Sequence, residues 1–384
     1  MTTDLIDRFP AVEDLRRVAK KRIPRFSWAH LDSGTGEETT HRRNQTAFDS
    51  IRMLPRWSES DIKPRLKTRI FGQNFEAPFG IAPLGATGLL WPGGEHILAE
   101  TAYAHGIPYC LSTAACETLE TVGAIARDRS WFQLYPSRDR AIRDDLIRRA
   151  MNSGFTALIV TIDVPVYSMR ERQRRAGLTV PTKIGFRTLM HILARPGWAL
   201  ATLRHGAPAF RLIEGYVGNT DMAKTANFLL HELSAPVDED YLREIRDQWH
   251  GPLMVKGILS PEGARRAVAL GVDGLIVSNH GGRQFDAAPP TIQVLPEIIK
   301  AVGAETTVLF DSGVRGGLDI IRALALGADF VLLGRAFAYG IAALGHEGGN
   351  HVCRLLKENL AINMTQLAVE TPETLRQLPI WTDR

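Results

Sequence analysis

The 384-residue sequence predicts a (β/α)8 TIM barrel with an N-terminal helical cap and a long insertion after the fourth strand. Eight short apolar runs recur along the chain, and a Gly-rich or polar turn and then a helical pattern follow most of them. Parallel strands require crossover connections, and right-handed helical crossovers allow eight strands to close into a ring. Periodicity alone leaves an open, doubly wound parallel sheet as the alternative.

The strands are predicted from runs that are apolar throughout, as in strands buried on both faces. We expect them at residues 79–82, 108–111, 131–135, 157–162, 253–255, 274–277, 307–310 and 330–333. A helix is expected from Ser260, an N-cap residue followed by Pro261 in the first turn, to Leu270. Residues 95–106 and 317–327 show the same scheme, and each ends in a glycine before the next strand.

Two segments, 1–75 and 166–240, lie outside this rhythm, although the whole chain is expected to form one domain, 1–384, with its barrel core at about 76–345. Residues 1–75 are predicted to form helices and irregular chain that cover one end of the barrel. Residues 166–240 form the insertion, and residues 346–384 form C-terminal helices. A connection as long as this insertion is usually functional or mobile.

Composition excludes several classes of protein. Lys+Arg 46 against Asp+Glu 42 gives a net charge of +4 without a basic block, so no nucleic-acid partner is expected. Three cysteines form neither a disulfide framework nor a zinc pattern and fit a reducing compartment. The stretch from His346 to His351 is one residue too long for a zinc helix, so no metal is expected. Residues 1–10 lack an apolar signal region, which favours a cytoplasmic protein.

Polar side chains gather at one end of the predicted strands. In a (β/α)8 barrel, residues that follow the strands build the active site. In strand order they are Pro83, Leu84 and Gly85; Ser112; Gln133 and Tyr135; Thr161 and Asp163; Lys256; Ser278, His280 and Arg283; Asp311, Gly313 and Arg315; and Gly334 and Arg335. The alternative is that they are ordinary polar caps of strands.

His280 is the strongest candidate for a general base, since an imidazole titrates near neutral pH. The glycines after it leave room for a substrate, and Arg283 is placed to hold a carboxylate with two hydrogen bonds. Asp163 is expected to accept the other imidazole N–H and to stabilise the imidazolium. A structural histidine is the alternative.

Two further patterns indicate an anionic ligand. Gly313, Gly334, Arg315 and Arg335 follow the last two strands, where barrels commonly bind phosphate. Lys256, directly after an apolar strand, requires an anionic partner. It suits either a Schiff base or a cofactor that becomes negative on reduction, and the residues alone do not decide between them. No G-x-G-x-x-G follows a strand, so a Rossmann nicotinamide site is not supported.

The block at residues 278–286 (SNHGGRQFD) resembles the active-site signature of the FMN-dependent L-2-hydroxy acid oxidising family, which includes glycolate oxidase, L-lactate dehydrogenase and mandelate dehydrogenase. Blocks at 131–135, 255–257, 311–316 and 323–328 also resemble family blocks, in family order. The stretches at 89–92 and 195–198 look most like mandelate dehydrogenase.

The resemblance implies FMN bound at the carboxyl ends of the barrel strands. It makes His280 the base with Asp163 as its partner, places Arg283 and Arg170 on the substrate carboxylate and Tyr135 on the hydroxyl, and puts Lys256 beside the flavin. For FMN it implies that Pro83, Leu84, Gly85, Ser112, Gln133 and Thr161 hold the ring with Ser278 nearby, that Asp311 holds the ribityl chain, and that Gly313, Arg315, Gly334 and Arg335 hold the phosphate.

His30 departs from the family pattern, which has a carboxylate-binding tyrosine at this position. A histidine still donates a hydrogen bond and can be cationic, so carboxylate binding is expected to persist with an altered pH dependence. A different substrate, or a carboxylate held by the two arginines alone, stays open.

The implied reaction oxidises an L-2-hydroxy acid to the 2-oxo acid, by hydride or carbanion transfer, in a homotetramer. Gly85, at a position that is alanine in glycolate oxidase, favours a quinone or other carrier as electron acceptor over oxygen. An oxygen-using oxidase that produces hydrogen peroxide is the main alternative. An FMN-dependent isomerase, a Schiff-base aldolase at Lys256 and a phosphate-binding scaffold are the others.

Part of the insertion, residues 183–214, mixes apolar and aromatic residues with Lys183, Arg187, Arg195, Arg204 and Arg211. Such a mixture suits a membrane interface, and the resemblance to mandelate dehydrogenase implies peripheral contact with the inner face of the cell membrane. A loop packed over the active site or against a partner subunit is the alternative.

Overall fold

The computed structural model describes residues 4–58, 61–178, 185–218, 225, 227–228 and 231–381. Eight parallel strands close into a barrel in the order β10-β11-β4-β5-β6-β7-β8-β9, which confirms the predicted fold and excludes the open sheet. Their bounds are β4 (Phe79–Leu84), β5 (Tyr109–Ser112), β6 (Ser130–Leu134), β7 (Ala157–Thr161), β8 (Leu253–Ile258), β9 (Gly274–Val277), β10 (Thr307–Phe310) and β11 (Phe330–Leu333).

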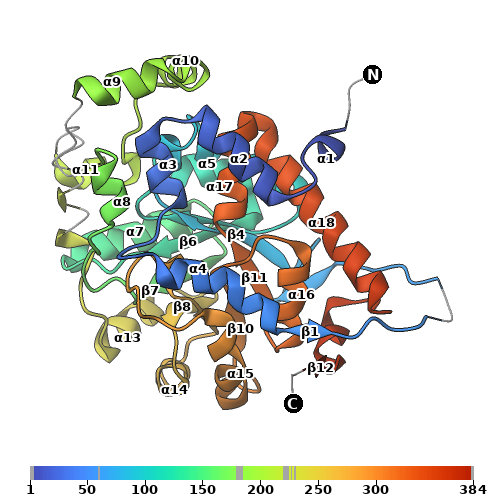
Figure 1. The fold of residues 1–384 in the computed structure, drawn as a ribbon. Helices are drawn as coiled ribbons and strands as arrows, with labels where there is room; N and C mark the ends of the chain where they lie inside the picture. Colours follow the sequence, from blue (N-terminus) through green and yellow to red (C-terminus); the bar gives the residue numbers. More distant parts are fainter. Residues whose placement is uncertain are drawn as a thin grey trace.

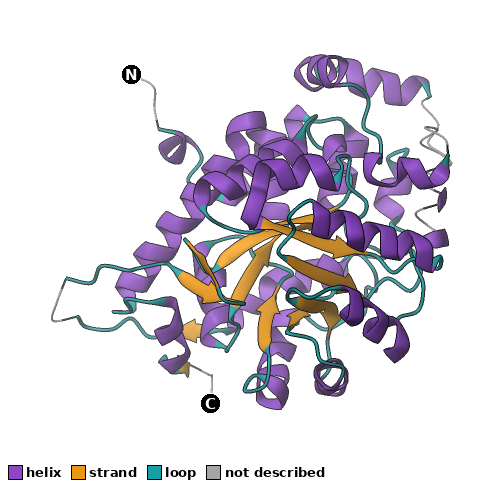
Figure 2. Ribbon diagram, turned by 180° about the vertical axis from the view of Figure 1, so that it is seen from behind, coloured by secondary structure: helices purple, strands orange, loops and turns teal. Residues whose placement is uncertain are grey.

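Helices surround the strands, which lie at the centre of the molecule (Figure 2). Those of the barrel wall are α5 (Gly94–His105), α6 (Leu119–Ala126), α7 (Arg140–Asn152), α13 (Glu239–Gln248), α14 (Pro261–Ala269), α15 (Thr291–Val302), α16 (Gly317–Ala325) and α17 (Arg335–Leu344). The Ser260 hydroxyl caps α14 by accepting from the Gly263 amide at 3.1 Å, as its sequence predicts.

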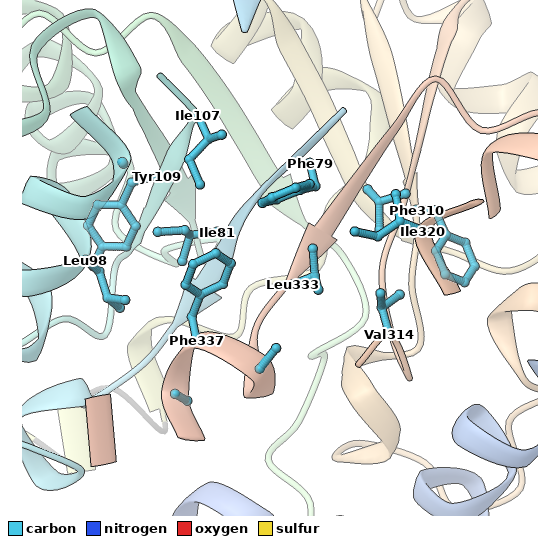
Figure 3. Packing of buried hydrophobic residues seen from close by; sticks show 14 of the residues in the cluster. Phe79, Ile81, Leu98, Ile107, Tyr109, Phe310, Val314, Ile320, Leu333 and Phe337 are labelled. Carbon is cyan, nitrogen blue, oxygen red and sulfur yellow. The ribbon is translucent and has the colours of Figure 1, made fainter. Parts of the chain in front are cut away.

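Apolar side chains on the outer face of the barrel pack against these helices. Ile81 of β4 pairs with Tyr109 of β5, and both are fully buried. Figure 3 shows Leu98 of α5 beside Tyr109 and Phe337 of α17 beside Ile81. This packing fixes the strands and therefore the positions of the residues at their carboxyl ends.

The N-terminal segment covers both ends of the barrel, so the prediction that it covers one end was wrong. Its helices are α1 (Leu5–Arg8), α2 (Val12–Arg22), α3 (Arg25–Asp32) and α4 (Thr39–Thr46), and its hairpin is β2 (Thr68–Ile70) with β3 (Gln73–Phe75). The Phe75 ring packs on Trp131 and Phe330, in the first two residues of β6 and β11, at centroid distances of 5.9 and 5.7 Å. These aromatic rings at the amino-terminal opening need an apolar cover, and the hairpin supplies it.

The described part of the insertion, between β7 and β8, includes helices α8 (Glu171–Arg175), α9 (Phe186–Leu193), α10 (Pro196–His205) and α11 (Arg211–Val217). Helices α9 and α10 stand at the outer edge of the molecule (Figure 1). Trp198 anchors α10 because its buried ring meets Phe26 of α3 edge-on at 5.8 Å. Lys183 lies outside the described residues.

The C-terminal region contains one long helix, α18 (Gly348–Gln366), and a short strand, β12 (Ile380–Trp381). Strand β12 pairs antiparallel with β1 (Arg52–Met53), so the C-terminal strand lies beside the segment that follows the N-terminal helices, below the barrel in Figure 1. Of the helices in the described ranges, none is long and apolar enough to span a bilayer.

Candidate active site

A cavity of about 1480 Å³ opens at the carboxyl ends of the strands and extends beneath the insertion. It collects most of the residues that the sequence singles out. Those that line it are His30, Pro83, Leu84, Gly85, Gln133, Tyr135, Thr161, Arg170, Lys256, His280, Arg283, Asp311, Gly313, Arg315, Gly334 and Arg335. The other three, Ser112, Asp163 and Ser278, stand behind this layer and bond to Gln133, His280 and Lys256 respectively.

His280 opens a single 3-10 turn, η4 (His280–Gly282), after a two-residue connection from β9. Its Nδ1 lies 2.9 Å from Asp163 Oδ1, and its Nε2 lies 3.3 Å from the Tyr135 hydroxyl. A carboxylate only accepts, so Nδ1 carries the hydrogen, and Nε2 presents its lone pair as an acceptor toward the Tyr135 hydroxyl. Burial lowers the pKa of His280, Asp163 opposes this shift and Lys256 adds to it, so the ring is neutral near neutral pH. The arrangement provides a base in the required tautomer.

The backbone around His280 is unusual and requires glycine. His280 itself has φ +56°, and Gly281 and Gly282 follow at +65° and +71°. A Cβ on Gly282 would lie 2.6 Å from the His41 backbone nitrogen in α4. The turn is therefore pressed against α4, and only glycine fits there.

Lys256 lies between two carboxylates. Its Nζ is 3.5 Å from Asp311 Oδ2 and 4.0 Å from Asp163 Oδ2, and it donates to the Ser278 hydroxyl at 2.9 Å. Burial alone would lower the pKa of Lys256, but the two carboxylates raise it above its usual value. The amine is thus held as a cation, which suits a neighbour that becomes negative and not a Schiff base, whose amine must be neutral.

Strand β8 runs further than the sequence predicts. It continues to Ile258 instead of ending at Val255, with a shift of register after Lys256. At this irregularity Gly257 has φ +110°, and a Cβ there would lie 2.6 Å from the Cβ of Asp163. The tight contact keeps the Asp163 segment against the strand that carries Lys256.

Two arginines create a local excess of positive charge. Arg170 Nη2 donates to Gln284 at 3.1 Å, while its buried Nε makes no hydrogen bond to a described residue. Arg283 Nη1 donates to the His30 carbonyl at 2.7 Å. Burial, then Arg170 and Arg335, lower the pKa of Arg283 well below its usual range. Cations this close are stabilised by an anion placed between them.

His30 is neutral in this structure. Its Nε2 donates to the Gly85 carbonyl at 3.1 Å. Burial, helped by Arg283 and Arg170, lowers its pKa to about 3. This shift, caused mainly by burial, favours the hydrogen-bonding role expected for His30 over the cationic one.

At one end of the cavity, two hydrogen-bond donors have no partner among the described residues, and they fit the ring of a flavin. Gln133 Oε1 accepts from Ser112 at 2.8 Å, which leaves Gln133 Nε2 buried without a partner among the described residues. The Thr161 hydroxyl is unpartnered in the same way. Oxygen and nitrogen acceptors on the isoalloxazine edge would satisfy both groups. With the Lys256 cation beside them, these residues fit FMN.

The other end of the cavity fits a phosphate. Buried Arg315 Nη2 has no partner in the described part of the chain. Gly313 has φ +91°, and a Cβ on it would lie 2.0 Å from the Asn44 carbonyl. Gly334 precedes the N-terminus of α17, where backbone amides attract anions. The Arg335 guanidinium is partly occupied, since it donates to the backbone carbonyls of Leu31, Gly281 and Ser33.

Sequence reasoning missed two features of the site. Asn44 of α4 and Asn279 exchange amide hydrogen bonds of 2.8 and 2.7 Å, which tie α4 to the His280 turn. Tyr167 lines the cavity with its ring 5.5 Å from the Arg170 guanidinium carbon. The only signal for Tyr167 was its position between Asp163 and Arg170.

Comparisons with known proteins agree with this geometry. Residues 19–382 match the family described as FMN-dependent dehydrogenase. The L-lactate dehydrogenase of a Caulobacter species is 38% identical over 374 residues, which cover 97% of this chain and 98% of the relative. The L-lactate dehydrogenase of Pseudomonas syringae is 35% identical, with 95% and 96% covered.

Solved structures agree as well. That of the monotopic membrane protein (S)-mandelate dehydrogenase superposes with a TM-score of 0.91 at 36% identity, covering 95% of this chain and 97% of that chain. Mandelate oxidase gives 0.83 at 32% identity, with 97% and 99% covered. The chain therefore belongs to the FMN-dependent 2-hydroxy acid dehydrogenase and oxidase family, and its cofactor is FMN.

Proposed function

We propose that this enzyme oxidises an L-2-hydroxy acid to the 2-oxo acid and passes the electrons from FMN to a quinone or another carrier. The observation that carries the proposal is the hydrogen bond of 2.9 Å between His280 and Asp163. Beside this pair lie Arg170 and Arg283, whose side-chain hydrogen bonds within the described residues go to neutral groups. A base and an anion site side by side fit an acid with a hydroxyl on its second carbon.

Each side chain has a distinct part in the proposed reaction. Arg170 and Arg283 bind the substrate carboxylate, and Tyr135 contacts the hydroxyl. His280 Nε2 takes a proton, and Asp163 stabilises the resulting imidazolium. Bound FMN supplies the redox chemistry. Lys256 balances negative charge on the reduced ring. Transfer as hydride or through a carbanion is compatible with this arrangement.

The electron acceptor distinguishes the proposal from its main alternative, an oxidase that reduces oxygen to hydrogen peroxide. We would add lactate, mandelate or glycolate anaerobically to the purified holoenzyme and follow loss of the oxidised flavin absorption. An air pulse or a short-chain quinone would follow. We expect bleaching by at least one acid and faster recovery with quinone. No bleaching by any 2-hydroxy acid would refute the function, and fast recovery in air with peroxide would favour the oxidase.

We also propose that the protein is cytoplasmic and binds the inner face of the cell membrane through residues 183–214, of which 185–214 are described. Exposed apolar side chains on α9 and α10 support this, and one relative is a monotopic membrane protein. Flotation with anionic liposomes, compared with neutral ones, tests it. A variant with Leu193, Leu200 and Leu203 changed to serine should float less, whereas equal flotation would contradict the proposal.

The proposed assembly is a homotetramer. Sedimentation equilibrium of the holoenzyme in detergent measures it directly, and a monomer at micromolar concentration would contradict it.

A further inference from the structure

We propose that the outer, apolar part of the cavity binds a lipid-soluble quinone, with Trp198 and Thr202 of α10 as hydrogen-bond donors to its carbonyl oxygens. The inference rests on the proposed function, in which a quinone accepts the electrons. It adds the place where the quinone binds and the residues that recognise it.

Two buried donors without partners carry the argument. Trp198 and Thr202 are four residues apart in α10, so they share one face of the helix, and both line the cavity. Trp198 Nε1 and the Thr202 hydroxyl are buried and make no hydrogen bond to any residue in the described part of the chain. Buried polar groups in native proteins are nearly always bonded, so these two donors call for an acceptor that the described residues do not supply.

The cavity that these donors line has apolar walls, which suit a flat, neutral ring. The Trp198 ring is fixed by its edge-on contact with Phe26. Apolar side chains that line the same cavity include Leu89, Leu90, Leu178 and Phe210. A quinone head group offers only acceptors on its polar edge and an apolar face elsewhere. The substrate carboxylate is drawn instead to the arginines, because the two donors of α10 carry no charge.

The cavity also has an apolar opening. Leu193 of α9 and Leu203 of α10 line it, yet they are 62% and 81% exposed. They therefore join the cavity to the exposed apolar surface of the two helices, which also carries Phe186, Leu189 and Leu200. Both helices lie at the outer edge of the molecule (Figure 1). A hydrophobic tail can leave by this route while the head group stays on Trp198 and Thr202.

Electrons and protons balance when a quinone is the acceptor. The 2-hydroxy acid loses two electrons and two protons when its C–H and O–H bonds break and the 2-oxo group forms. Bound FMN would supply the relay for these two electrons, with no net change in the cofactor. The quinone gains two electrons and two protons, and each of its carbonyl oxygens becomes a hydroxyl.

The test uses the holoenzyme with decylubiquinone as the probe. Trp198→Phe and Thr202→Val remove a donor and preserve most of the side-chain shape. Trp57→Phe, on a side chain that is 92% exposed, and Thr365→Val, whose exposed hydroxyl bonds within α18, are the matched controls. Melting temperature and FMN content verify folding for each variant.

We expect the KM for decylubiquinone to rise about fivefold in each α10 variant and further in the double variant, because each loses one neutral hydrogen bond. The rate of anaerobic flavin bleaching by substrate should not change. Photolabelling with an azido-quinone should mark residues 196–205, and decylubiquinone should suppress the label. This last measurement does not depend on turnover.

Three results would overturn the inference. The first is an unchanged KM with the label elsewhere. The second is slower bleaching by substrate in the α10 variants, which would assign the donors to the substrate side chain. The third is normal bleaching in the unmodified enzyme without reduction of the quinone. Absence of bleaching in the unmodified enzyme is a separate outcome, because it would refute the proposed function itself.

Discussion

Replacement of Asp163 by asparagine tests the proposed mechanism most directly. The substitution keeps the size of the side chain and removes the charge that lies 2.9 Å from His280 Nδ1. Loss of a hydrogen bond to a charged group costs about 1.5–3 kcal/mol, which corresponds to roughly a 10- to 150-fold slower reductive step.

A second effect adds to this loss. The asparagine amide can donate to Nδ1 and so drive the ring hydrogen onto Nε2, the nitrogen that faces Tyr135 and should accept the proton. The same substitution in a serine protease triad lowers kcat by about 10⁴ for this reason. We therefore expect a decrease between about 10²-fold and 10⁴-fold, with FMN retained.

The pH profile gives an independent check. His280 acts as a base only when neutral, so the rate falls as pH drops through its pKa. Asp163 raises that pKa, and Lys256 lowers it. Without the carboxylate the acid limb should move to lower pH. Stopped-flow bleaching across pH would show this, with Asp128→Asn, an exposed carboxylate, as the control. An unchanged rate, or a limb that moves to higher pH, would refute the mechanism.

Four further substitutions extend these tests. His280→Gln should bind FMN but lose turnover by several orders of magnitude in the bleaching assay, and near-normal turnover would refute its role as base. Lys256→Met should lower the FMN reduction potential in a dye-equilibrium titration, because the reduced ring loses its counter-charge; an unchanged potential would separate Lys256 from the flavin. Gly282→Ala should lower FMN occupancy and the melting temperature, since its Cβ would meet α4, and wild-type values would contradict the contact. His30→Tyr should change KM but leave its pH dependence between pH 5 and 9 unaltered, because the pKa of His30 is about 3; a profile shifted within that range would show that His30 titrates.

The barrel was predictable because its strands are apolar on both faces. All eight predicted runs are strands, and their ends differ from the prediction by at most three residues. Local pattern does not show where a strand bulges. The sequence therefore predicted neither the extension of β8 through Gly257 nor the position of Lys256 inside that strand.

The residues of the site were predictable from the sequence only where they follow the ends of the barrel strands. Nearly every polar residue at those ends lies in the cavity or directly behind it. Contacts between distant segments were not predictable, such as that of Asn44 with Asn279, 235 residues apart. The sequence also did not predict that the Arg335 side chain donates to the carbonyls of Leu31 and Ser33 at the end of α3. Every residue has a backbone carbonyl, so the sequence does not show which ones accept a hydrogen bond.

Helix α4 packs against two glycines of the site. Retention of the cofactor therefore depends on a helix that precedes the barrel strands in the sequence. Gly282 and Gly313 both approach backbone atoms of this helix, at His41 and Asn44. The turn that bears the base and the loop beside the phosphate end can therefore reach their final shape only after residues 39–46 have docked. A single proteolytic cut in α4 should release bound FMN while the barrel stays folded. The N-terminal helices would then be the part of the chain that retains the prosthetic group.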